Sequence, residues 1–100
     1  MKLHPMKAIT IVTEAHARGP LVRLLSEVGA HGYTLAHVEG AGMQGERFAD
    51  LPESANIEVK VLMPPDAAQR LLDRVAEEFF PRFATIAYET DVRVLRPEKF

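Results

Sequence analysis

The chain has 100 residues, of which 47% are hydrophobic and 26% are charged, which is enough apolar material for the core of one domain. Its formal net charge is -2, so it lacks the positive potential with which proteins attract nucleic acid. It contains no cysteine, which excludes disulfides, thiol catalysis and cysteine-rich zinc sites, and agrees with a reducing, cytoplasmic setting.

The ends and the hydropathy pattern predict neither a signal peptide nor a membrane span. Residues 1–5, MKLHP, are too few and too polar for the apolar centre of a signal peptide. No run approaches the roughly 18 apolar residues that cross a bilayer. We therefore expect a cytoplasmic protein, which can still act at a membrane by binding a membrane protein.

The first half of the chain predicts a strand, a helix and a second strand. Residues 8–13 are β-branched and alternate, as in a strand. Gly19-Pro20 opens a helix and Gly29 ends it, because proline is tolerated at the first helical positions and glycine favours the residue after the helix. Residues 33–38 form the second strand. The apolar stripe of the helix is Leu21, Leu24, Leu25 and Val28.

The second half repeats this order. Residues 57–63 alternate as a third strand, Pro64-Pro65-Asp66 begins a second helix, and Pro81 stops that helix. The expected buried face of the second helix is Ala68, Leu71, Leu72, Val75 and Phe79.

A last strand from about residue 85 to residue 95 carries two unlike faces, and residues 96–100 are expected to fray. The apolar face is Ile86, Tyr88, Thr90, Val92 and Val94. The other face is Ala87, Glu89, Asp91 and Arg93. We expect Tyr88 in the core or in a subunit interface.

The resulting βαββαβ order predicts an α+β, ferredoxin-like sandwich over residues 1–100: an antiparallel four-stranded sheet with both helices on one face. The connection between the second and third strands, about residues 41–54, is much longer than the two to five residues of a hairpin loop. Loops of this length in small domains usually carry function.

The start of that connection is rich in glycine. Residues 39–47 read EGAGMQGER, with three glycines in six positions. Successive N–H groups of such a segment can form a concave anion site, and the Arg47 guanidinium would add a fork suited to phosphate or carboxylate. This pattern also fits an ordinary loop without a ligand.

Other side chains give weaker indications. The four histidines have no metal-ligand spacing, so no metal site is predicted; they are His4, His16, His31 and His37. No serine has a base in recognisable register, so nucleophilic catalysis is not predicted. Thr13 and Glu14, at the end of the first strand, are candidate ligand contacts, because ligands often collect at strand ends.

Several segments, in this order and spacing, resemble PII-type signalling proteins, and among them the PII-like subgroup associated with bicarbonate transporters and carboxysomes. The resemblance runs from about Lys7 to Arg96. The segments that carry it are residues 11–14 (IVTE), 29–34 (GAHGYT), 40–45 (GAGMQG), 57–59 (IEV) and 79–80 (FF).

The resemblance implies a homotrimer with an adenine nucleotide in each cleft between neighbouring subunits. It implies a regulatory protein and not an enzyme, with ligands but no cofactor. Residues 41–54 correspond to the family's T-loop, which changes conformation with the ligand and contacts a target protein. The members of this subgroup point to bicarbonate sensing, carbon fixation and a bicarbonate transporter or another carbon-metabolism partner.

The resemblance also assigns site residues by position. The base of the T-loop, around the nucleotide, corresponds to Thr34, Gly40, Gly42 and Gln44. The resemblance implies that Glu58 and Lys60 of the third strand line the adenine pocket. It implies that Arg47 helps to hold the phosphate end and that Arg96 reaches the phosphates from the adjacent subunit.

The chain departs from ordinary PII proteins between the second helix and the last strand. Those proteins have a glycine-rich phosphate loop ending in lysine, where this chain has only residues 81–85, PRFAT. We expect a weaker hold on polyphosphate, which favours AMP, ADP or a cyclic nucleotide over ATP, with Arg82 or the Thr85 main chain as substitutes.

Two further departures concern the loop. Phe48 is its only aromatic residue, so the tyrosine that nitrogen-sensing members modify is missing. Met43 stands where a basic residue often lies, which argues against binding of Mg-ATP with 2-oxoglutarate. These departures favour the hypothesis of an inorganic-carbon sensor with bicarbonate as a second ligand.

Three alternatives stay open at this point. A cation-binding trimer of the copper-tolerance type has the same element order but needs clustered metal ligands. A small enzyme on a ferredoxin-like dimer, such as an isomerase, needs a buried acid–base pair over the sheet. A structural adaptor needs neither.

Overall fold

The computed structural model describes residues 1–40 and 55–100. The strands are β1 (His4–Glu14), β2 (Thr34–Val38), β3 (Asn56–Met63) and β4 (Ile86–Val94). The helices are α1 (Arg18–Glu27) and α2 (Pro65–Glu78), and short 3₁₀ turns cover Ala15–Ala17 and Pro97–Lys99. The predicted βαββαβ order is confirmed.

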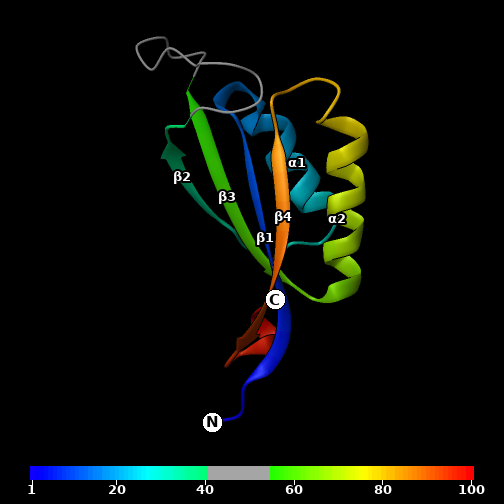
Figure 1. Ribbon diagram of the computed structural model, residues 1–100. Coiled ribbons are helices and arrows are strands. Elements are labelled where there is room, and N and C mark those ends of the chain that lie inside the picture. The colour runs from blue at the N-terminus through cyan, green and yellow to red at the C-terminus, as the bar shows by residue number, and fades with distance from the viewer. Residues whose placement is uncertain (41–54) are drawn as a thin grey trace.

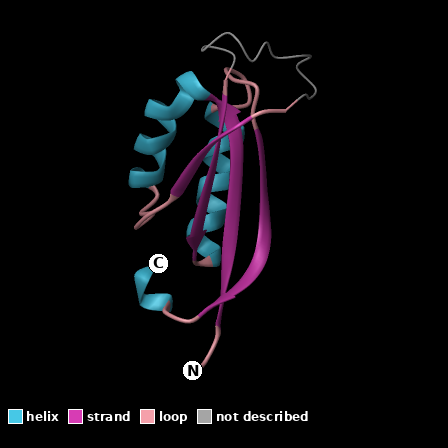
Figure 2. Cartoon of the chain, turned by 90° about the vertical axis from the view of Figure 1, so that its left-hand side faces the viewer, coloured by secondary structure: helices cyan, strands magenta, loops and turns pink. Residues whose placement is uncertain are grey.

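The four strands form one antiparallel sheet in the order β2-β3-β1-β4 (Figure 1). Both helices lie on one face of the sheet, as the view turned by 90° makes clear (Figure 2). The other face is left open by the described residues. This arrangement is the predicted ferredoxin-like α+β fold.

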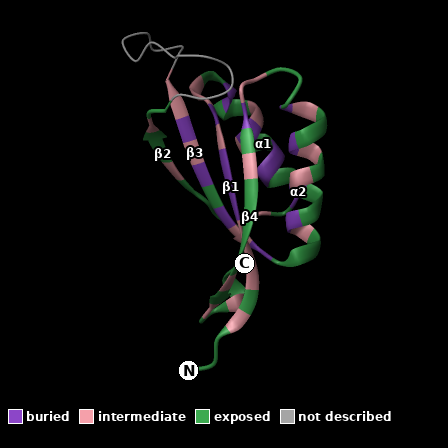
Figure 3. Cartoon of the chain, in the orientation of Figure 1, coloured by how far each residue is buried: buried purple, intermediate pink, exposed green. Residues whose placement is uncertain are grey.

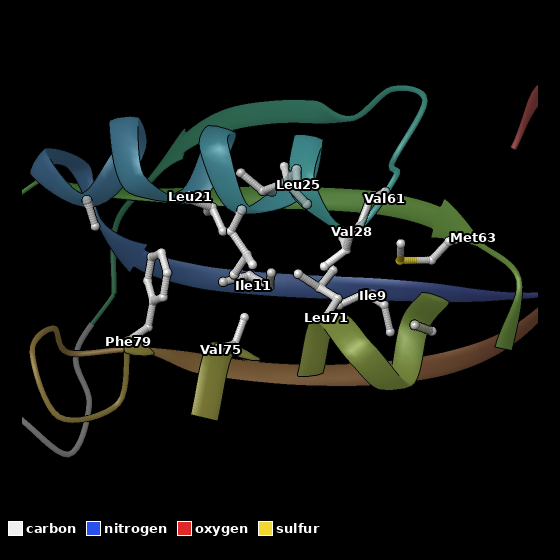
Figure 4. Close-up of a cluster of buried hydrophobic side chains, with 14 of the residues drawn as sticks. Ile9, Ile11, Leu21, Leu25, Val28, Val61, Met63, Leu71, Val75 and Phe79 are labelled. Carbon is white, nitrogen blue, oxygen red and sulfur yellow. The ribbon is translucent and has the colours of Figure 1, made fainter. Parts of the chain in front are cut away.

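The core fills the space between the sheet and the helices (Figure 4). Both predicted helical stripes are buried in it, apart from Leu72, which is half-buried. Each fully buried side chain of this size contributes roughly 1.5–3 kcal/mol of transfer free energy. The largest buried side chains are Ile9, Ile11, Leu21, Leu24, Leu25, Ile57, Met63, Leu71 and Phe79.

Strand β1 begins four residues before the predicted start at residue 8 because β4 provides it with a partner there. His4 pairs with Val94, and Pro5 with Arg93. Strand β3 pairs with β1 only from Lys7 onward. At Pro5, therefore, β1 is an edge strand on one side, which is where a strand tolerates proline. The two strands run as a ribbon past the helical layer toward the N-terminus (Figure 1).

The helix ends follow local chemistry. Gly29 follows α1 with a φ of 84°, the left-handed conformation that favours glycine. Pro65 occupies the start of α2, and the helix ends at Glu78, before Pro81. The expectation that residues 96–100 fray is wrong for Pro97–Lys99, which forms a 3₁₀ turn closed by the Phe100 N–H on the Pro97 carbonyl at 3.1 Å.

The two faces of β4 are placed differently from those of the central strands. Its apolar residues lie on the open face, where Ile86 is 46% and Tyr88 51% exposed. Figure 3 shows β4 exposed or intermediate along its length, whereas β3 has buried positions. Tyr88 is therefore not in the core of the chain. Its charged residues lie on the helix side, where Lys7 Nζ is 2.5 Å from Asp91 Oδ1 and 3.1 Å from Glu89 Oε2.

Candidate functional site

One row of side chains crosses the open face of the sheet from edge to edge. In register, Thr34 of β2 faces Lys60 of β3, which faces Thr10 of β1. Thr10 in turn faces Tyr88 of β4. Glu58 lies two residues along β3 from Lys60, and its Oε1 is 3.5 Å from Lys60 Nζ. Three of the predicted nucleotide-site residues, Thr34, Glu58 and Lys60, therefore share this face.

The chemistry of this row is mixed. It combines two threonine hydroxyls and a Glu58–Lys60 ion pair with the exposed apolar surface of Ile86 and Tyr88. An adenine base presents apolar faces and hydrogen-bonding edges, so it needs both kinds of surface. The same apolar surface also suits contact with another protein chain.

A second group of predicted residues lies where β2 ends and β4 begins. Gly40 follows β2, whereas Arg82 and Thr85 precede β4. Strands β2 and β4 are the two edges of the sheet. Three strand spacings, roughly 14 Å, separate them. Gly40 and Arg82 are therefore joined to opposite edges of the sheet.

The Thr85 side chain is already used inside the chain. Its hydroxyl donates to the Phe83 carbonyl at 3.2 Å and lies 2.8 Å from the Thr13 hydroxyl. Thr13 is fully buried, so the structure gives it a packing role and not the ligand contact that its position at a strand end suggested. A ligand contact of Thr85 would come from its main chain, as expected from the sequence.

Arg96 lies at the opposite end of the molecule. It follows the last residue of β4, whereas Arg82 precedes the first. The nine residues of β4 span roughly 25–30 Å. Arg96 Nε is 3.7 Å from Glu98 Oε1, and both side chains are exposed. Within one chain, Arg82 and Arg96 cannot contact the same nucleotide.

The remaining predicted residues, Gly42, Gln44 and Arg47, lie outside the described residues, as does most of the glycine-rich segment. Of the described site residues, the structure brings Thr34, Glu58 and Lys60 together on the open face and places Arg82 and Arg96 beyond opposite ends of β4.

Among the described residues, the ion pairs of Arg74 and Lys7 lie away from the predicted site residues. Arg74 Nη2 donates to Glu27 Oε1 at 2.7 Å, which joins the two helices, and Arg74 Nε donates to Glu78. The hydrogen bond from Arg74 lowers the pKa of Glu78 below its usual value. Hydrogen bonds to Asp91 and then Glu89 raise the pKa of Lys7. The Arg74–Glu27 bond joins α2 to α1 and the bonds of Lys7 join β1 to β4, whereas the Arg74–Glu78 bond lies within α2.

Phe83 is not among the site residues predicted from the sequence. Its ring centroid lies 5.0 Å from Arg82 Cζ, 5.4 Å from the His16 ring centroid and 5.5 Å from that of Phe79. His16 Nε2 is also 3.5 Å from Glu14 Oε2. The four-residue interval between Phe79 and Phe83 is a contact spacing of helices, and it is a signal in the sequence. Pro81 hides it, because proline interrupts the helical pattern.

In residues 1–40 and 55–100, no group of three or more His, Cys, Asp or Glu side chains is placed to hold a metal ion. None of the helices described is long and apolar enough to cross a membrane.

The chain matches known proteins of the same fold over almost its whole length. The family model for nitrogen regulatory protein P-II matches residues 6–99. A PII-like signalling protein of Thermus thermophilus is 40% identical, with a TM-score of 0.87. The alignment covers 100% of this chain and 99% of that one.

Structures of CPII, a PII-like protein of Thiomonas intermedia K12, are also similar. The structure of CPII bound to ADP and bicarbonate is 29% identical, with a TM-score of 0.89, over 99% of this chain and 97% of that one. The structure of CPII bound to ADP, AMP and acetate is 27% identical, with a TM-score of 0.85, over 100% and 98% of the two chains.

Proposed function

The chain belongs to the P-II family of regulatory signalling proteins, and on this premise we propose that it is a sensor of adenine nucleotides and bicarbonate. AMP and ADP are favoured over ATP, because residues 81–85 are too short for a glycine-rich phosphate loop. The likeness to CPII bound to ADP and bicarbonate over almost the whole chain carries this proposal.

The proposed assembly is a homotrimer with one nucleotide between each pair of neighbouring subunits. The open, partly apolar sheet face supports it, because such a face in a small domain gains stability when a second copy covers it. The separation of Arg82 from Arg96 supports it too. Two subunits can supply to one nucleotide what the two ends of a single β4 cannot.

The proposed output is binding to a protein target, such as a membrane bicarbonate transporter or another partner in carbon fixation, in the cytoplasm or a carboxysome. Residues 41–54, which lie outside the described residues, would make this contact as the T-loop of the family. The ligand can select one arrangement of that segment only as far as it binds that arrangement better than another.

Calorimetry and thermal unfolding with AMP, ADP, ATP and cyclic AMP, each with and without bicarbonate, test the proposal. At a hundred times its dissociation constant, a bound nucleotide adds about 2.7 kcal/mol to the free energy of unfolding. Light scattering should give three times the chain mass of 11.1 kDa. A monomer, or a trimer whose melting temperature no adenylate changes, contradicts the proposal.

Copper and zinc serve as the control ligands in the same thermal experiment. A cation-binding trimer of the copper-tolerance type would respond to one of the metals and not to ADP. The proposed sensor responds to ADP, and the metals leave its melting temperature unchanged.

A further inference from the structure

The connection between α2 and β4 is held at several points by its own hydrogen bonds. The Phe79 carbonyl accepts the N–H groups of Arg82 at 3.0 Å and Phe83 at 2.8 Å. Beyond them, the Phe83 carbonyl accepts the Thr85 hydroxyl at 3.2 Å. The Thr85 hydroxyl also lies 2.8 Å from the buried Thr13 hydroxyl of β1. The main chain around Arg82 is thereby fixed from both sides.

The Phe83 ring is fixed as well. It packs against Phe79, which is 2% exposed and belongs to the core. It also meets the His16 ring in a T-shaped contact, with an angle of 60° between the ring planes. Arg82 lies against this ring, with Cζ 5.0 Å from its centroid. The ring is therefore a rigid support for a cation that is otherwise exposed.

Contact of a guanidinium with an aromatic ring leaves its N–H donors able to bind a carboxylate or phosphate. Within the described residues, Arg82 forms no ion pair, in contrast to Arg74, which bonds both Glu27 and Glu78. The charge of Arg82 contributes to lowering the pKa of Glu78, but Glu78 accepts its hydrogen bond from Arg74. Among the residues that the structure describes, Arg82 is thus a preorganised donor with no protein acceptor.

We propose that Phe83 is a positioning residue that holds the Arg82 guanidinium for the phosphate groups of the nucleotide. This inference rests on the proposed function and deepens it. It assigns to an arginine supported by an aromatic ring the role that a glycine-rich loop has in ordinary PII proteins. Phe83 acts only through Arg82 and does not itself contact the ligand.

A double-mutant cycle measured by calorimetry with ADP tests this directly. Arg82→Ala should weaken ADP binding by about ten- to a hundred-fold, the scale of a charge-assisted hydrogen bond. Phe83→Leu, which keeps an apolar side chain of similar bulk, should weaken it by about two- to five-fold through loss of the cation–π contact. In the Arg82→Ala background, Phe83→Leu should cause no further loss.

Phe83→Tyr is the matched control, because it keeps the ring and should bind ADP like the wild type. Arg82→Lys leaves the ring untouched and should weaken binding, since an ammonium neither stacks nor forms a fork. Equal losses from Phe83→Leu with and without Arg82 would overturn the inference. The inference would also be overturned if Arg82→Lys and Arg82→Ala both bound ADP with wild-type affinity. If the wild type itself fails to bind ADP, it is the proposed function that fails.

Discussion

The two faces of the sheet are built from the same strands, but one is buried under the helices and the other is exposed. The face under the helices is closed, and Ile9, Ile11 and Ile57 on it are 0% exposed. The open face carries Ile86 and Tyr88 about half exposed, together with Thr10 at 5%. Antiparallel sheets with one solvated face usually make that face polar. The open face of this sheet instead combines apolar and polar side chains, which is the surface that the proposed homotrimer would cover.

The largest expected effect compares two isoleucines, one on each face. Ile57→Ala should lower the free energy of unfolding by about 2–5 kcal/mol, because it leaves a cavity in the closed core. Ile86→Ala should act through subunit association, so its effect should shrink as the protein is diluted. Urea unfolding at several protein concentrations separates the two. A concentration-independent loss for Ile86→Ala would remove the distinction between the faces.

The second prediction concerns the open face alone. Tyr88→Lys should weaken subunit association at least about ten-fold, or 1.4 kcal/mol, because an interface would have to bury an unpaired charge. Light scattering over a dilution series measures this. Ala76→Lys adds the same charge to an exposed position on α2 and should stay fully associated. Identical masses for both variants would mean that the open face is not the interface.

The smallest expected effect concerns the charged half of β4. Hydrogen bonds to Asp91 and Glu89 raise the pKa of Lys7 above its usual value of 10.5. The resulting stabilisation is complete below the pKa of the unfolded chain and is lost as the pH rises through the higher pKa of the folded chain. The melting temperature of the wild type should therefore exceed that of Lys7→Met at neutral pH, and this difference should shrink above about pH 10.5. A difference that is constant from pH 7 to pH 12 would contradict it.

Much of the fold follows from periodicity, but the assignment of faces does not. The stripe of Leu21, Leu24 and Leu25 is buried as the helical spacing predicts. In β4, alternation separates Tyr88 from Glu89 but cannot say which of them faces the helices, because a period of two is symmetric between the faces. Pairing with Ile9 and Thr10 of β1 decides this. That pairing depends on residues about 80 positions away, which no local pattern reveals.

The candidate site, too, could be predicted from the sequence only in part. The resemblance assigned Thr34 to the base of the T-loop and Lys60 to the adenine pocket, and the structure places them opposite each other in neighbouring strands. No sequence pattern pointed to the Thr13–Thr85 hydroxyl pair, because its members are 72 residues apart. The support of Arg82 by Phe83 depends on a turn between α2 and β4 whose hydrogen bonds become visible only in three dimensions.

The length of β4 has a consequence for when such a protein is active. A lone copy carries Arg82 and Arg96 at the two ends of that strand, out of reach of each other. Under the proposed arrangement, a newly made or highly diluted single copy can offer a nucleotide only one of these two arginines. The fraction of copies with a complete nucleotide site would then rise with the concentration of the protein. Incomplete assemblies would not bind the nucleotide and would give no signal.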